Sequence, residues 1–180
     1  MGTRFYLIGY MASGKSFLGR TVAGMLEMSF VDLDREIESM AGKGIPEIFS
    51  SEGEQAFRQY ESDALKKTGR SENMIIATGG GTPCFGDNME WMNAHGETIF
   101  LDAPVDVLAD RIVHSKHVRP LVAGIPAGEL PGFISKHLAG RLPFYHEAQH
   151  VLSIFPEKEK NVRNLYELLL ESMHAGKEDV

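Results

Sequence analysis

The sequence predicts an α/β domain, a three-layer sandwich in which a five-stranded parallel sheet is covered by helices on both faces. Short apolar runs alternate along the chain with segments in which apolar residues recur at helical spacing. A glycine-rich loop directly follows the first apolar run, a context typical of phosphate-binding α/β proteins. No repeat, low-complexity tract or linker divides the sequence. We therefore expect residues 1–180 to form a single domain.

The apolar runs are the expected strands, and helices fill the segments between them. Strands are predicted at Phe5–Ile8, Ser29–Val31, Met74–Ala77, Thr98–Leu101 and Val151–Ile154. Helices are predicted after Gly14, through Ile37 and Met40, and over Ile45–Phe49, Glu52–Lys67, Asp87–Asn93, Pro104–Val113, Pro131–Ala148 and Val162–Met173. The charged run Glu157–Lys160 is expected to be a solvated turn before the last helix.

Residues 114–130 show neither the helical nor the strand periodicity of apolar residues, and they contain Gly124, Pro126 and Gly128. A segment of this length without regular structure is uncommon in a compact domain unless it is functional. We expect it to be a mobile lid, with Arg119 on it.

The stretch from Gly9 to Ser16 fits the pattern G-x-x-x-x-G-K-[ST] of a P-loop, between a predicted strand and a predicted helix. Gly14 lets the backbone curl around an anion, and the helix N-terminus adds its dipole. Lys15 can reach the β- and γ-phosphates, and the Ser16 hydroxyl can ligate Mg²⁺ directly. The alternative is a glycine-rich turn with a surface lysine. The motif in this setting predicts a P-loop NTPase-type fold that binds ATP or GTP through residues 12–17, Ala12, Ser13, Gly14, Lys15, Ser16 and Phe17.

Two carboxylates follow the second predicted strand, Asp32 and Asp34. Ligands of open parallel sheets bind outside the carboxyl ends of the strands, where these side chains are expected. One carboxylate can order water around Mg²⁺ while the other accepts a proton from an attacking hydroxyl. A helix cap with a spare acid is the alternative, and it would be preferred for an isolated Asp-x-Asp.

Three glycines, Gly79, Gly80 and Gly81, leave the third predicted strand at the same edge. Without side chains, their N–H groups can approach a small polar ligand closely. A flexible turn explains this stretch equally well.

The composition limits the partners and the cellular locations that the protein can have. The formal net charge of −7 argues against nucleic acid as the main partner, and the single cysteine, Cys84, excludes an intrachain disulfide. The first strand begins too early for a signal peptide, and no apolar run approaches the ~20 residues that span a bilayer. We expect a cytoplasmic monomer with no membrane contact.

Jointly, these motifs resemble the shikimate kinase family. The phosphate loop followed by Leu18-Gly19-Arg20, the Asp32-Leu33-Asp34 turn and the three-glycine loop are similar to family motifs. The resemblance continues through Gly53-Glu54, Phe57-Arg58 and Glu61, the Arg119-Pro120-Leu121 lid motif, and Arg141-Leu142-Pro143-Phe144-Tyr145. It covers nearly the whole chain in the same order.

The resemblance implies transfer of the γ-phosphate of ATP to the 3-hydroxyl of shikimate, in aromatic amino-acid biosynthesis, with Mg²⁺. It implies that Asp34 holds the substrate hydroxyls and serves as base, and that Asp32 supports Mg²⁺ through water. Its other implied roles are a carboxylate grip by Arg58 and Arg141, a backbone contact from Gly80, lid closure by Arg119 over the phosphates, and packing of Arg111 on adenine.

Two positions depart from the family pattern, which usually has glycine at position 12 and commonly threonine at position 17. Ala12 adds a methyl group to the phosphate cradle, which we expect to be tolerated if its φ angle stays negative. Phe17 lacks a hydroxyl for the α-phosphate, so weaker nucleotide affinity is expected.

A competing motif is present at His146-Glu147-Ala148-Gln149-His150, which matches the H-E-x-x-H pattern of zinc metalloproteases, with Glu167 or Glu171 downstream as a third ligand. That motif needs both histidines on one helix. Because His150 directly precedes a predicted strand, we expect the helix to end before it and the protease interpretation to fail.

The sequence thus predicts a shikimate kinase. A kinase of another small hydroxy acid, such as gluconate, is the enzyme alternative, and a nucleotide-dependent switch is the non-enzyme alternative. A switch would have no reason to combine Asp34, Arg58, Gly80 and Arg141 with a phosphate loop.

Overall fold

The computed structural model describes residues 3–115 and 120–178 of the chain. Its centre is one five-stranded sheet, as predicted, with all neighbouring strands parallel in the order β2-β3-β1-β4-β5. The strands are β1 (Arg4–Ile8), β2 (Ser29–Asp32), β3 (Met74–Ala77), β4 (Glu97–Asp102) and β5 (His150–Ser153).

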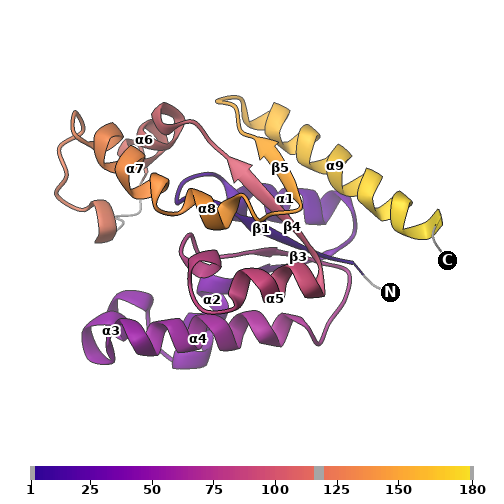
Figure 1. The fold of residues 1–180 in the computed structure, drawn as a ribbon, viewed down its shortest axis with the longest axis horizontal. Helices are drawn as coiled ribbons and strands as arrows, with labels where there is room; N and C mark the ends of the chain where they lie inside the picture. The colour runs from indigo at the N-terminus through magenta and orange to yellow at the C-terminus, as the bar shows by residue number, and fades with distance from the viewer. Residues whose placement is uncertain (1–2, 116–119, 179–180) are drawn as a thin grey trace.

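Helices cover both faces of the sheet, which confirms the three-layer arrangement. Figure 1 shows α1 and α9 on one side and α4 and α5 on the other, with α6 and α7 beyond the carboxyl ends of the strands. The helices are α1 (Lys15–Met25), α2 (Leu33–Ala41), α3 (Ile45–Ser51), α4 (Gly53–Thr68), α5 (Asn88–His95), α6 (Val105–Val113), α7 (Leu130–Ala139), α8 (Leu142–Tyr145) and α9 (Lys158–Glu178). Short 3-10 turns occupy Thr82–Cys84 and Pro120–Val122. Of the helices described, none is long and apolar enough to cross a membrane.

The central strands are buried on both faces, as a parallel sheet covered by helices requires. The side chains of Phe5, Leu7, Ile75 and Ile76 are fully buried. Because both side-chain directions of these strands meet helices, β1 and β3 read as continuous apolar runs without polar alternation.

The register of the sheet brings three loops together. Ala77 of β3 pairs with Leu7 of β1 on one side and with Asp32 of β2 on the other. The phosphate loop, the Asp32–Asp34 turn and the three-glycine loop therefore all begin at one level of the sheet. This is the edge at which ligands of open α/β sheets bind.

The predicted bounds of two helices need correction by several residues. The single helix expected over Pro131–Ala148 is divided into α7 and α8 at Gly140 and Arg141. Pro143 explains the break, since it has no N–H to bond the carbonyl of Ala139 and a continuous helix would need that bond. The last helix begins at Lys158 and not at residue 162, so Lys158 and the two residues after it are helical and do not belong to a turn.

The predicted lid is described in part. His114 caps the end of α6, the turn Pro120–Val122 follows the undescribed residues 116–119, and α7 begins at Leu130. The described part of this segment is otherwise irregular, as predicted, although Val122 and Leu130 are buried against the domain. Mobility of this segment stays a prediction.

Candidate active site

The phosphate loop has the backbone conformation that its glycines permit. Gly9 and Gly14 have φ angles of 137° and 107°, and Gly14 caps α1, which begins at Lys15. The Lys15 ammonium is buried and donates to the carbonyl oxygens of Gly9 and Tyr10 at 2.7 and 2.9 Å. Ser16 lies in the first turn of α1 and is exposed. The strand, loop and helix predicted around the motif are thus confirmed.

Ala12 corrects one expectation about this loop. Its φ angle is +63°, whereas we expected the methyl group to be tolerated at negative φ. The left-handed conformation places the Ala Cβ close to the next carbonyl oxygen and costs roughly 1–2 kcal/mol, which glycine avoids. The loop therefore holds Ala12 in a backbone conformation that glycine adopts more readily.

Arg111 of α6 connects the phosphate loop to the segment after β5. Its Nη1 donates to the carbonyl oxygens of Ala12 and Ser13 at 3.3 and 3.0 Å, and its Nη2 donates to that of Phe155 at 3.0 Å. Asn161 holds the backbone of Phe155 in place, since its side-chain amide accepts from the Phe155 N–H and donates to the Phe155 carbonyl. The Arg111 guanidinium is therefore fixed by backbone oxygens at the predicted nucleotide site.

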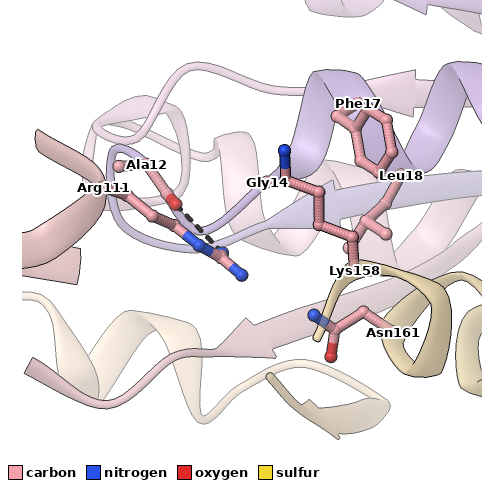
Figure 2. A pocket seen from close by; sticks show the side chains of 7 residues that line it. All are labelled: Ala12, Gly14, Phe17, Leu18, Arg111, Lys158 and Asn161. Atoms are coloured by element: carbon pink, nitrogen blue, oxygen red, sulfur yellow. Dashed lines mark hydrogen bonds between the residues drawn. The ribbon is translucent and has the colours of Figure 1, made fainter. Parts of the chain in front are cut away.

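Figure 2 shows the pocket beside this guanidinium, of about 240 Å³, between the phosphate loop and the start of α9. Half of the Phe17 surface is exposed there, and Lys158 Nζ lies 5.7 Å from the centre of the Phe17 ring. The wall at position 17 is consequently apolar and offers no hydroxyl. Its lining residues are Ala12, Gly14, Phe17, Leu18, Arg111, Lys158 and Asn161.

The two aspartates take different positions at the end of β2. Asp32 caps α2, with Oδ1 accepting the N–H of Asp34 at 3.2 Å, so the helix-cap interpretation is correct for Asp32. Asp34 lies in the first turn of α2 and lines a pocket of about 360 Å³ together with Lys15, Ser16 and Gly80. The cap thus fixes the turn that carries Asp34 toward the phosphate loop.

The pKa of Asp34 is raised to about 6. The side chain is accessible from the cleft, yet the cleft walls displace much of its water, and this desolvation is the main cause. The charges of Asp32 and Glu61 raise the pKa further, and Lys15 opposes them. A carboxylate with a pKa near 6 is ionised at neutral pH and can accept a proton more readily than an ordinary aspartate.

The three glycines each face a different polar side chain at close range. A Cβ added to Gly79 would lie 2.8 Å from Glu61 Oε1 and 3.2 Å from Asp34 Oδ1. A Cβ at Gly80 would lie 3.2 Å from Arg141 Nη1, and one at Gly81 would lie 2.9 Å from Arg58 Nη1. The geometry favours close approach over a flexible turn, because this loop gathers Asp34, Arg58 and Arg141 around one backbone.

Arg58 of α4 lies beside Gly81 and is restrained by several contacts. It donates to Glu61 at 2.9 Å and to Glu54 at 3.0 Å, and its guanidinium carbon lies 3.6 Å from the centre of the Phe85 ring. Ion pairing is therefore part of its role, as is common for a helical arginine. The same contacts hold its planar fork beside Gly81.

Glu61 is the residue whose role the sequence did not reveal. It is 1% exposed and accepts from Arg58 through one carboxylate oxygen and from Thr82 at 2.6 Å through the other. The family resemblance includes Glu61 but implies no function for it. Its spacing of three residues from Arg58 on one helix was the available signal.

Arg141 lies at the junction of α7 and α8, near Tyr10 and Tyr145. Its guanidinium carbon is 5.6 Å from the centre of the Tyr10 ring. Tyr145 is buried and its hydroxyl donates to the Gly80 carbonyl at 2.6 Å, while burial raises the pKa of this phenol. Arg119, the remaining predicted site residue, lies outside the described residues.

The two histidines of the H-E-x-x-H match do not share a helix. α8 ends at Tyr145, His146 packs against the Phe100 ring, and His150 begins β5 with its Nε2 2.9 Å from Glu97 Oε2. Across residues 3–115 and 120–178, no three His, Cys, Asp or Glu side chains are grouped to hold a metal ion. The expectation that the helix ends before His150 is confirmed.

Comparison with known proteins gives a consistent result. The model of the shikimate kinase family matches residues 11–174. Shikimate kinase of Parabacteroides distasonis is 44% identical over 145 residues, covering 81% of this chain and 84% of that protein. The crystal structure of shikimate kinase from Bacteroides thetaiotaomicron has a TM-score of 0.88 at 41% identity, covering 94% of this chain and 99% of its own. Shikimate kinase from Acinetobacter baumannii in complex with shikimate has a TM-score of 0.84 at 30% identity, covering 98% and 96% of the two chains.

Proposed function

The chain belongs to the shikimate kinase family, and from this premise we propose how its own residues transfer a phosphoryl group. As a shikimate kinase it phosphorylates the 3-hydroxyl of shikimate with ATP. The observation that supports the residue roles most strongly is the crowding around the three-glycine loop. Asp34, Arg58 and Arg141, from three separate elements, all approach that loop beside the phosphate-binding turn.

Asp34 acts as the general base. It takes the proton of the attacking 3-hydroxyl while that oxygen forms a bond to the γ-phosphorus and the bond from phosphorus to the β-phosphate oxygen breaks. ADP then leaves with the electron pair of the broken bond. The raised pKa suits this role, because the group is ionised at neutral pH and still basic enough to hold the proton.

The phosphate loop binds and orients the triphosphate. Backbone N–H groups at the start of α1 favour negative charge, and Lys15 supplies a cation at the β- and γ-phosphates. Arg111 contributes indirectly, because it fixes the carbonyl oxygens of Ala12 and Ser13 and so the shape of the loop. A phosphate contact by Arg119 from the lid stays a prediction.

Arg58 and Arg141 bind the shikimate carboxylate. A planar carboxylate is best held by guanidinium forks, and both forks lie against neighbouring glycines of one loop. Glu61 and Phe85 hold Arg58 in place from two sides. Gly80 adds a backbone contact, so the acceptor is oriented with its hydroxyl toward Asp34.

Mg²⁺ fits the oxygen donors at this site. The Ser16 hydroxyl would bind it directly and Asp32 would bind it through water, and a set of oxygen ligands completed by phosphate and water is what Mg²⁺ prefers. When bound, it neutralises charge that develops on the phosphates.

We further propose that residues 1–180 act as one domain and as a monomer, and that the protein is located in the cytoplasm.

A coupled ADP-release assay tests the proposal, with shikimate, gluconate or no acceptor in parallel. Shikimate should give turnover well above the other two conditions, because only this acceptor places a carboxylate and a reactive hydroxyl correctly together. Faster turnover with gluconate would favour the alternative of a kinase for another small hydroxy acid. ADP release independent of any acceptor would favour the nucleotide-dependent switch.

A further inference from the structure

Tyr10 and His137 join two parts of the cleft that are far apart in the sequence. Tyr10 lies in the phosphate loop and is 1% exposed, and its hydroxyl oxygen is 2.8 Å from Nδ1 of His137 on α7. The two rings meet edge to face at 5.6 Å, and His137 also stacks on Phe133 of its own helix at 5.7 Å. Both partners of the hydrogen bond are thus held by packing.

The direction of this hydrogen bond depends on the charge and the tautomer of the imidazole, and with Nε2 protonated the Nδ1 atom accepts from the Tyr10 hydroxyl. Burial and the positive charge of Arg141 lower the pKa of His137, so the ring is neutral at pH 7. A neutral imidazole has one acceptor nitrogen, and the phenol of Tyr10 can donate to it. Tyr10 keeps its proton, since burial raises the pKa of its hydroxyl.

Arg141 rests on the ring that this hydrogen bond fixes. Its guanidinium carbon is 5.6 Å from the centre of the Tyr10 ring, within the range of a cation–π contact. Arg141 comes from the break between α7 and α8, four residues after His137, where the backbone is outside regular helix. The fork of this arginine consequently depends on side-chain contacts for its orientation.

We propose that Tyr10 and His137 are positioning residues for the substrate carboxylate: His137 fixes the Tyr10 ring, and the ring fixes the Arg141 fork beside Gly80. This inference rests on the proposed role of Arg141 and adds two residues that touch neither reacting atoms nor substrate. It also means that the phosphate loop itself carries part of the acceptor site. The expected signature is a weaker grip on shikimate with little change for ATP.

The test is steady-state kinetics on His137→Phe, Tyr10→Phe and the double variant. Each single change should raise the KM for shikimate about three- to tenfold, the effect of one lost hydrogen bond, and the double variant should add little more. The KM for ATP of His137→Phe should stay within about twofold. His137→Asn should recover most of the loss, because Asn Oδ1 offers an acceptor near the position of Nδ1.

Two further variants make the result decisive. Tyr6→Phe is the matched control, since the Tyr6 hydroxyl is also buried and bonded, to Thr68 at 3.1 Å in the core, and its loss should leave the KM for shikimate unchanged. Arg141→Lys should raise that KM more than tenfold. If Arg141→Lys does so while His137→Phe and Tyr10→Phe stay within twofold of wild type, the positioning inference is overturned and the proposed role of Arg141 stands. If Arg141→Lys also has no effect, the proposed role of Arg141 fails, and the inference fails with it.

Discussion

Gly79→Ala introduces one methyl group at the most crowded point of the cleft. The new Cβ would lie 2.8 Å from Glu61 Oε1, 3.0 Å from Thr82 Oγ1 and 3.2 Å from Asp34 Oδ1, all closer than ordinary van der Waals contact. Glu61 cannot move aside easily, because it is buried and bonded to Arg58 and Thr82. Overpacking of this kind costs about 1–3 kcal/mol, which for a chain of this size lowers Tm by about 2–12 °C.

The same methyl group should damage activity more than stability. Displacement of the Asp34 carboxylate by a fraction of an ångström disturbs the base and the hydroxyl it receives, and a misplacement of 1 Å can cost about 100-fold in rate. We therefore expect kcat/KM for shikimate to fall by about two orders of magnitude in the coupled assay. Thermal unfolding of the same samples measures the loss of stability.

Gly24→Ala is the control for this experiment. Gly24 lies in α1 with nothing within 4 Å of its added Cβ, so the substitution should leave activity intact and stabilise the helix by about 0.5–1 kcal/mol. If Gly79→Ala keeps both the Tm and the activity of wild type, the close approach of Glu61, Thr82 and Asp34 around this loop does not exist in solution.

Three other predictions concern single residues of the site. Asp34→Asn should lower kcat by ~10²–10⁴ while ATP still binds, and kcat/KM of wild type should rise with pH through about 6, as the base ionises; turnover near the wild-type rate would remove Asp34 from this role. Because the folded pKa of Asp34 exceeds its unfolded value, its contribution to stability is present below the unfolded pKa and is lost as the pH rises through about 6, so Asp34→Asn should raise Tm over wild type at pH 8 but not at pH 4. Ala12→Gly should stabilise the protein by about 0.5–1 kcal/mol, since relief of the left-handed strain exceeds the added freedom of the unfolded chain, and a lower Tm would contradict the positive φ angle. Arg119→Ala should lower kcat more than it weakens ATP binding, whereas equal losses would indicate uniform binding.

The sequence predicted the elements whose signal is local. The buried strands β1 and β3 are visible as apolar runs, and the phosphate loop is visible because its backbone requires Gly14 at a positive φ angle. Asp34 could be proposed because the carboxyl end of a parallel strand is a general location of ligands. In each case a short stretch of sequence carries the information.

Residues whose role comes from tertiary contacts could not be found this way. Glu61 looks like any surface glutamate on an amphipathic helix until the fold places Thr82 and Arg58 against it. The partners Tyr10 and His137 are 127 positions apart, and only the fold places His137 against the loop. The positive φ angle of Ala12 could not be predicted either, because the loop geometry imposes a backbone conformation that alanine alone would not adopt.

Two local signals compete at the break between α7 and α8. Apolar periodicity continues across Gly140 and Arg141, and it suggested one helix up to residue 148. Pro143 removes a hydrogen bond that this helix would need, and that constraint overrides the periodicity. The break matters for the proposed function, because Arg141 at this break lies beside Gly80 and over the Tyr10 ring.

The most direct test of the site is a comparison of shikimate with an analogue whose carboxylate is reduced to an alcohol. Calorimetric titration of wild type and Arg58→Lys with both compounds isolates the grip of the two arginines on that carboxylate. Wild type should bind the analogue much more weakly than shikimate, and Arg58→Lys should weaken shikimate binding by more than tenfold, about 1–3 kcal/mol, while the analogue loses little more. Equal binding of the two compounds to wild type would contradict a carboxylate clamp formed by Arg58 and Arg141.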